Sequence, residues 1–287
     1  MLGGFVAPDG NTKVQCGILY KTAKQWGLKI TFSHLNEQEV WVAYHKVLIP
    51  ALIYPLGAIP LDETQRKKIM GPALKAMLPK LGLSATTARD PIHAVPRHGG
   101  PGIADIYTHT GTMRIKMFLG HWRENDATVD ILKISMGCCQ QEVEIGPNLL
   151  EKDYRKYGWI LQHCWIKVLW QFLDDINGTI IIEEDWHQQR YENDIYLMNI
   201  VHDMALSKDQ IRQINQCRLF KRVTFISEIL HHDLHDFHLD IWDPTKQMSS
   251  NINKRFPIIE MPKQYWPLWR TVLEAVRSAN RIPIRDS

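Results

Sequence analysis

The sequence lacks the features of a membrane protein, a secreted protein or a thiolate metal site. Its five cysteines include no CxxC pair and no disulfide framework, so free thiols are expected. The longest uncharged run, residues 47–61, is interrupted by three prolines and is too short to span a bilayer. The N-terminus has neither the basic nor the apolar region of a signal peptide. We therefore expect an intracellular protein with no membrane partner.

A strong net charge is also missing. The chain has 287 residues, with 34 Lys and Arg against 31 Asp and Glu, which gives a net charge of +3. Any contact with nucleic acid must therefore come from local groups of cations rather than from the field of the whole chain. Hydrophobic residues make up 45% of the sequence, enough for the core of one large domain or two ordinary ones.

Helical patterns dominate the first 85 residues. The first predicted helix covers residues 12–26, and its apolar side contains Val14, Ile18, Leu19 and Ala23. Asn36 is an N-cap residue with Glu39 three positions later, and Pro50 is expected to bend or end the helix that follows. Asp62 and Gln65 form a second such pair, and a kink is expected at residues 71–72 of the third helix.

The second part of the chain is also predicted to be helical. Glycine and proline mark residues 84–102 as a connection, which suggests a helical domain at 1–85, a loop at 86–102 and a helical extension at 103–287. Further helices are predicted at residues 103–122, 128–143 and 154–173, from Ser207 past Phe220, and from Pro267 onward. Short strands are expected at residues 2–8 and 179–182. The predicted fold class is mainly α, with helical bundle-like subdomains and a few short strands.

Asp174 and Asp175 follow an aromatic residue and a leucine, as the metal-binding aspartates of some polymerases do. Two-metal catalysis needs such carboxylates on a tight turn between strands, together with a third carboxylate. Here the pair ends a long apolar stretch that is predicted to be helical. We therefore interpret it as the solvated C-terminus of a helix, and no cofactor or metal is expected there.

A histidine-rich segment offers an alternative interpretation. His232 and Asp233, with His235 nearby and His202 upstream, resemble the metal-binding pair of helical HD-type phosphohydrolases. The Gly-Lys pair that usually follows in that family is replaced by Leu234-His235. A metal-dependent phosphohydrolase using these four residues remains an alternative to be tested.

Two groups of cations are candidates for binding phosphate. Lys21 and Lys24 lie in the first predicted helix and Lys29 follows it, with Trp26 as a packing or stacking neighbour. Arg218, Lys221 and Arg222 are spaced i, i+3, i+4, which would place them together on one helix face. A solvated helix face without a ligand is the simpler alternative for both groups.

Several short elements resemble the region downstream of the polymerase palm in reverse transcriptases of eukaryotic retrotransposons. In chain order they are Leu2-Gly3 with residues 7–11, residues 41–44 and 48–55, the block at residues 99–103, and Pro262, Trp266, Trp269 and Arg270. The first resembles the strand and turn before the thumb, the second the thumb helix, and the last a tryptophan-containing element of long post-palm extensions.

The resemblance implies that residues 1 to about 85 are the end of the palm and the thumb, which grips a template–primer duplex by its backbone. It also implies that the catalytic carboxylates lie upstream of Met1 in a separate palm domain. Asp174 and Asp175 do not replace them, because in this family the catalytic pair precedes the Leu-Gly strand. We therefore expect nucleic-acid binding without enzymatic activity of the chain alone; a helical protein-interaction module is a further alternative.

Overall fold

The chain forms two compact units, each built from two segments of the sequence. The first unit contains Met1–Asp130 and His163–Phe172, and the second contains Ile131–Gln162 and Leu173–Ser287. The computed structural model describes residues 11–146, 148–183, 186, 191, 194–231, 236–248, 256 and 259–278. The connection predicted at 84–102 lies inside the first unit, so the expected division of the chain does not coincide with these units.

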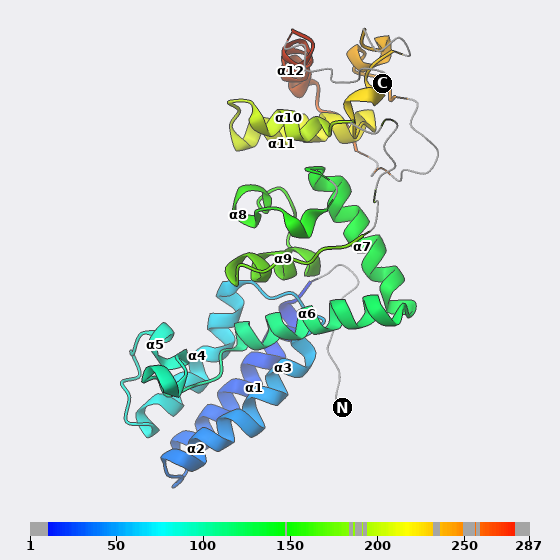
Figure 1. Ribbon diagram of the computed structural model, residues 1–287. Helices are drawn as coiled ribbons and strands as arrows, with labels where there is room; N and C mark the ends of the chain where they lie inside the picture. Colours follow the sequence, from blue (N-terminus) through cyan, green and yellow to red (C-terminus); the bar gives the residue numbers. More distant parts are fainter. Residues whose placement is uncertain are drawn as a thin grey trace. The chain divides into compact units, whose positions relative to one another are not determined.

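The fold is mainly α, as predicted (Figure 1). The first unit contains α1 (Lys13–Thr31), α2 (Glu37–Ala43), the short π-helix η1 (Tyr44–Leu48), α3 (Ile49–Leu56), α4 (Glu63–Lys80), α5 (Arg89–His93), η2 (Pro96–His98) and α6 (Ile106–Glu124). Helices shared between the two units are α7 (Ala127–Val143) and α9 (Trp165–Asp175). The second unit contains η3 (Leu149–Glu151), α8 (Tyr154–Tyr157), α10 (Leu197–Asp203), α11 (Lys208–Lys221), η4 (Ile226–Glu228), η5 (Leu239–Trp242), η6 (Lys263–Tyr265) and α12 (Trp266–Ser278).

The predicted strands are not part of the described fold. Residues 179–182 form no strand, and the stretch at 2–8 lies outside the described residues. Among the described residues, β pairing is limited to two isolated bridges, one of which joins Tyr196 to Phe225. The chain in the described ranges also has no helix with the length and apolar character needed to cross a membrane.

The first unit is organised around the contact between α1 and α4, which lie side by side (Figure 1). Gly27 allows this close approach, since a Cβ atom there would lie 2.9 Å from the carbonyl oxygen of Pro72. The contact fixes the rotation of α1. Its buried face carries Gln15, Leu19, Ala23, Trp26, Gly27 and Ile30. Val14 and Ile18 are therefore exposed, and the prediction that they belong to the apolar contact is wrong.

The capping predictions for the next helices are confirmed, whereas no helix ends at Pro50 or at Pro72. Asn36 and Asp62 each form a capping box with the residue three positions later. The chain remains helical from α2 to α3 because the wide turn η1 comes just before Pro50, which has no N–H to donate. Helix α4 continues through Pro72, since its packed face extends on both sides of that residue.

The C-terminal end of α3 is held by side chains from α6 and α9. The carbonyl oxygens of Leu56 and Ile59 accept hydrogen bonds from Arg114 Nη2 at 2.9 and 2.8 Å. Trp165 Nε1 donates to the carbonyl of Gly57 at 2.7 Å. These bonds satisfy carbonyls that have no partner inside the helix. Burial lowers the pKa of Arg114 to about 10, so the guanidinium stays charged at neutral pH.

The single buried helix predicted at residues 154–173 is wrong. The structure has the short helix α8, an irregular segment and then α9. In a continuous helix the carbonyl of Lys156 would accept the N–H of Ile160, but the Trp159 indole donates to it instead, at 2.8 Å. Helix α9 begins only after Cys164, whose carbonyl accepts the N–H of Val168 at 3.1 Å. The stretch is apolar, as predicted, but its conformation depends on the hydrogen bond of the Trp159 indole, which the sequence pattern does not show.

The two C-terminal helix predictions are confirmed. Ser207 and Gln210 form the capping box of α11. The last helix starts one residue before Pro267, and it buries Trp269, Val272, Leu273 and Val276.

Candidate nucleic-acid interface

The three candidate lysines of α1 lie on its solvent-facing side. Lys21, Lys24 and Lys29 are exposed, and none forms an ion pair with any other described residue. Helix α1 contains no Asp or Glu. Phosphate groups can therefore approach these ammonium groups without displacing a carboxylate.

Trp26 has a different role from its lysine neighbours. It is 8% exposed, and its ring meets the edge of Tyr44 with a centroid distance of 5.9 Å. The indole therefore packs in the core and holds α1 in place rather than offering a face for base stacking. Of the two roles considered for Trp26, the structure supports packing.

Helix α4 adds two lysines that the sequence-based candidates omitted. Lys68 and Lys75 are exposed and stand i, i+7 apart, so they lie on one face of α4. Burial raises the pKa of the Cys16 thiol on α1, and the charge of Lys68 opposes this rise. Lys68 is therefore near the first half of α1. The spacing could have indicated this pair, but the neighbour of α4 was not known from the sequence.

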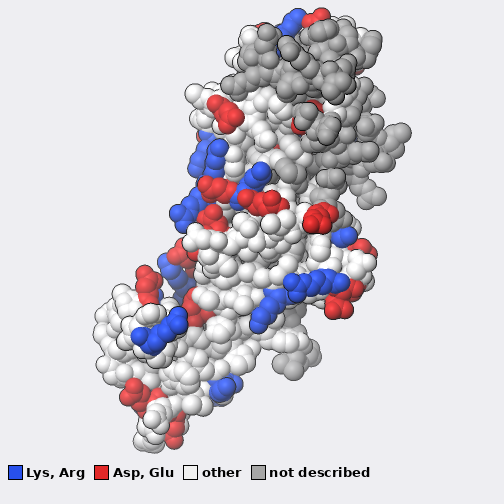
Figure 2. Space-filling model, viewed as in Figure 1, with Lys and Arg blue, Asp and Glu red and all other residues white. Residues whose placement is uncertain are grey.

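The first unit concentrates positive charge in its first three long helical segments. Residues 13–80 contain ten Lys and Arg against four Asp and Glu, a net charge of +6. The rest of the chain is net negative, since the whole carries only +3. On the face of the molecule seen in Figure 2, both signs are interspersed, with no extended area of one sign. The positive character is thus a local property of α1 and α4.

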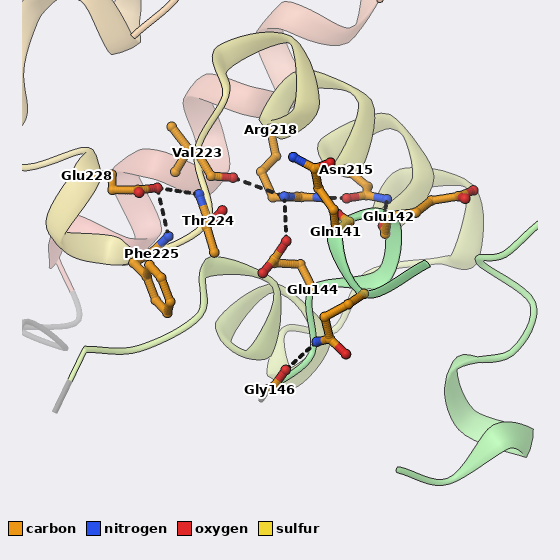
Figure 3. Close-up of polar contacts among 11 residues, drawn as sticks. Gln141, Glu142, Glu144, Gly146, Asn215, Arg218, Val223, Thr224, Phe225 and Glu228 are labelled. Atoms are coloured by element: carbon orange, nitrogen blue, oxygen red, sulfur yellow. Dashed lines mark hydrogen bonds and ion pairs between the residues drawn. The ribbon is translucent and has the colours of Figure 1, made fainter. Parts of the chain in front are cut away.

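The second predicted basic patch is wrong, because Arg218 is fully buried, and Figure 3 shows its polar contacts. Its Nε donates to Asn215 Oδ1 at 2.9 Å, and its Nη1 donates to the carbonyl of Val223 at 3.0 Å. Nη2 donates to the carbonyl of Gln141 at 2.5 Å, and Nη1 pairs with the buried carboxylate of Glu144 at 3.4 Å. Burial lowers the pKa of Arg218, and Glu144 opposes this shift. The guanidinium joins α7 to α11 and is not accessible to phosphate.

Lys221 is also buried in α11, and it binds the segment 240–246 to this helix. Its Nζ donates to the carbonyls of Asp240 at 2.7 Å and Lys246 at 2.8 Å, and also to that of Asp243. Burial lowers the pKa of Lys221 to about 8. All three donors of the ammonium group are used, so Lys221 is also unavailable to a nucleic acid. Arg222, the third member of the predicted patch, ends α11 in a left-handed conformation with φ 59°.

The acidic pair Asp174 and Asp175 ends α9, as predicted. Asp174 accepts a hydrogen bond from Arg155 Nε at 3.0 Å, in a partly exposed ion pair. The chain then turns at Asn177, and Gly178 N–H donates to the carbonyl of Leu173 at 2.8 Å. Within the described ranges, no three His, Cys, Asp or Glu side chains come together as a metal site.

His202 is the one residue of the alternative phosphohydrolase site that the structure describes. His232, Asp233 and His235 lie outside the described residues. The His202 ring packs against Tyr157 at a centroid distance of 4.8 Å, and its Nε2 is buried with no hydrogen bond to the described residues. Burial lowers the pKa of His202 to about 4, with a smaller contribution from Lys156. The ring is therefore neutral at pH 7 and contributes to packing at the end of α10.

Comparison with known protein families, curated sequences and solved structures gives no significant match to this chain. Its function must therefore be inferred from its own residues.

Proposed function

We propose that the first unit binds the phosphate backbone of a nucleic-acid duplex through Lys21, Lys24 and Lys29, with no catalytic activity of its own. The observation that carries this proposal is the set of exposed α1 lysines on a helix without any acidic residue. Lys68 and Lys75 on the neighbouring helix α4 are further exposed cations. We refer to these five lysines as the lysine interface.

Backbone recognition fits the chemistry of this surface better than base recognition. Phosphate contacts require mobile cations at the surface, which five exposed lysines supply. Reading of base edges usually depends on Arg, Asn or Gln side chains placed for paired hydrogen bonds. Helix α1 has no Arg, and Trp26 is buried. The interface is therefore expected to recognise the negative charge of the duplex and not its base sequence.

The resemblance of the N-terminal elements to a reverse-transcriptase thumb gives this proposal its biological setting. A thumb grips the duplex formed by template and primer while a separate palm performs the chemistry. We propose that this chain is such a non-catalytic segment and that its partners are a template–primer duplex and a palm domain encoded upstream. An RNA–DNA hybrid is then the preferred ligand.

The test is binding of the full chain to an RNA–DNA hybrid duplex over a range of salt concentrations. Each phosphate contact contributes about −0.9 to the slope of log affinity against log salt on a B-form duplex. Simultaneous Lys21→Glu, Lys24→Glu and Lys29→Glu should therefore flatten the slope by about 3. An affinity that does not fall as salt rises would count against backbone contacts.

A matched control carries the same change in net charge elsewhere. Lys116, Lys156 and Lys263 are exposed and lie outside the lysine interface. Charge reversal at these three positions should leave most of the slope intact. If both triple variants lose affinity equally, then only the total charge matters and the interface is not on α1 and α4.

A protein partner is the second candidate, because the same face of α1 also exposes apolar side chains. Val14, Ile18 and Leu28 are each about half exposed, and Phe32 just after the helix is 80% exposed. Such residues beside lysines would fit an acidic amphipathic helix. Replacing Val14, Ile18 and Leu28 by Ser would abolish a protein contact but leave the salt-dependent duplex affinity unchanged.

A further inference from the structure

The second unit contains a pocket of about 800 Å³ that the lysine interface does not involve. This volume lies in the range of small-molecule binding sites. Its walls come from α7, from residues 159–162 between α8 and α9, from α11, and from Phe256 and Ile259. Cys138, Gln141 and Glu142 follow the i, i+3, i+4 spacing of one helix face, as do Arg212, Asn215 and Gln216. Two regular helix faces and a connecting segment therefore form most of the pocket, and Phe256 and Ile259 form the rest.

The buried Arg218 network holds these two helix faces together. Arg218 binds the main-chain carbonyl of Gln141 on α7 and the side chain of Asn215 on its own helix (Figure 3). Asn215 Nδ2 in turn donates to the carbonyl of Glu142 at 2.7 Å. Three pocket residues are thus positioned by one guanidinium, which gives the pocket a preorganised wall.

The side-chain amide of Gln141 lines the pocket and forms no hydrogen bond with the described residues. Gln141 is 8% exposed as a whole residue, but its amide atoms are not among the fully buried polar atoms without a partner, so the amide is in contact with solvent. A group that enters the pocket can therefore hydrogen-bond to this amide in place of water. Leu161 and Leu219 beside it are buried and apolar. The inner part of the pocket thus combines apolar walls with an amide donor and acceptor.

The outer part of the pocket is aromatic and cationic. The Arg212 guanidinium carbon lies 5.1 Å from the centre of the Trp159 ring, and Lys208 Nζ lies 5.7 Å from it. Arg212 is exposed and pairs at 3.1 Å with the solvated carboxylate of Asp209. Exposed pairs of this kind contribute little, so an anionic ligand can compete for the guanidinium. A ligand with a flat polar ring and a negative group would complement Trp159 and Arg212.

We propose that this pocket binds a nucleotide. The base lies beside Trp159 with its hydrogen-bonding edge on the Gln141 amide, and the phosphate lies on Arg212. Gln amides pair with the donors and acceptors of bases, and stacking on Trp is favourable for every base. Arg binds phosphate through paired N–H donors. A free nucleotide and an unpaired nucleotide of a single strand share this chemistry.

Calorimetric titration of the full chain tests this assignment, with adenosine monophosphate, adenosine and ribose 5-phosphate as probes. The nucleotide should bind at least tenfold more tightly than either part alone, because it engages both ends of the pocket. An affinity no greater than that of ribose 5-phosphate would overturn the proposal. A short single strand of deoxyadenosine distinguishes the sources. Tighter binding of the strand identifies an unpaired nucleotide as the ligand, and weaker binding identifies the free one.

Two substitutions separate the two ends of the pocket. Gln141→Leu keeps the main-chain carbonyl that Arg218 uses and should weaken both the nucleotide and adenosine about tenfold. Arg212→Gln changes an exposed residue that the fold does not need, and it should weaken the nucleotide but not adenosine. The proposal fails if Arg212→Gln affects both ligands equally or if Gln141→Leu affects neither. Lys24→Glu in the lysine interface should leave nucleotide affinity unchanged, so a failure of the duplex proposal would not affect this one.

Cys138 reports whether the ligand occupies this pocket. Its side chain is exposed and lines the pocket, whereas Cys139 and Cys217 are buried. Saturating nucleotide should slow the alkylation of Cys138 by iodoacetamide several-fold, measured by mass spectrometry of the peptides. Cys16, which is half-buried in the first unit, serves as the internal reference. Nucleotide binding without any protection of Cys138 would place the ligand elsewhere and overturn the assignment.

Discussion

The two units use the same kind of side chain in opposite ways. In the first unit, Lys21, Lys24 and Lys29 are exposed on α1, and the α1–α4 contact forms through small and apolar residues. In the second unit, Arg218 and Lys221 are fully buried and bind main-chain carbonyls and a carboxylate. Lysine or arginine in a helix therefore does not by itself indicate a surface for a ligand.

The difference follows from the regularity of the backbone in each unit. Long helices satisfy their own polar groups, so α1 and α4 can pack through Gly27 without help from charged side chains. The second unit has shorter helices and more irregular segments, whose carbonyls need donors. Arg218 and Lys221 supply them. Four predictions test this contrast, in order of decreasing effect.

Replacing Arg218 should have the largest effect. Arg218→Met would leave the Glu144 carboxylate and the carbonyls of Gln141 and Val223 buried without their donor. We expect the free energy of unfolding to fall by about 3–5 kcal/mol, as for other broken buried ion pairs. Denaturation in urea measures it, and Arg212→Met, in the same helix but exposed, should change stability by less than about 0.5 kcal/mol.

A second substitution separates the charge from the hydrogen bonds. Adding Glu144→Gln to Arg218→Met removes the buried carboxylate and should recover part of the lost stability. If the double variant is no more stable than the single one, the carbonyl bonds carry the effect and the ion pair does not. Equal stability of wild type and Arg218→Met would show that the contrast between the units is wrong.

Because of His202, the free energy of unfolding should decrease as the pH falls below about 6.5. Burial lowers its pKa to about 4 in the folded state, whereas the unfolded state titrates near 6.5. Between these values the unfolded chain binds more protons, so stability falls as the pH drops from 6.5 to about 4. Allowing for the remaining solvent contact, we expect a loss of about 2 kcal/mol.

The contribution of His202 is isolated by comparison with His202→Phe, which keeps an aromatic ring against Tyr157. Carboxylates titrate in the same range, so the quantity of interest is the difference between the two stability profiles. The wild type should lose more stability than the variant as the pH falls. Parallel profiles would mean that the imidazole is solvated in the folded protein.

Gly27 tests the contact that organises the first unit. In Gly27→Ala the new Cβ would meet the Pro72 carbonyl oxygen at 2.9 Å, a backbone atom that moves only with its helix. We expect a loss of about 1–2 kcal/mol, since the strain exceeds the gain in helix propensity. Gly17→Ala in the same helix meets nothing within 4 Å and should stabilise the protein by about 1 kcal/mol. Thermal unfolding of the two variants should therefore shift in opposite directions.

The sequence predicted helices and caps better than it predicted which face of a helix is buried. The boxes at Asn36, Asp62 and Ser207 depend on residues three positions apart, so local pattern was sufficient. The burial of Arg218 depends on the Gln141 carbonyl of α7, more than 70 positions away in the chain. The exposure of Ile18 depends on where α4 approaches α1.

The candidate site shows the same limit. Lys21, Lys24 and Lys29 could be predicted as surface cations because α1 offers no acidic partner along its length. Lys68 and Lys75 could not be joined to them, since no local signal pairs the first helix with the fourth. The nucleotide pocket also depends on residues of α7 and α11 that only the fold brings together.

The smallest expected effect on stability distinguishes a functional surface from a structural one. Lys24→Met removes a single exposed ammonium group that pairs with no described residue, so the free energy of unfolding should change by less than about 0.5 kcal/mol. The salt slope of duplex binding should nevertheless fall by about 1, because one phosphate contact is lost. Lys80→Met on α4 is the matched control, since its Nζ donates to the Ser33 carbonyl at 2.9 Å. That variant should lose stability without a change in slope. If Lys24→Met instead destabilises the fold and leaves the slope intact, the lysines of α1 serve the helix rather than a ligand, and the two units use their cations alike.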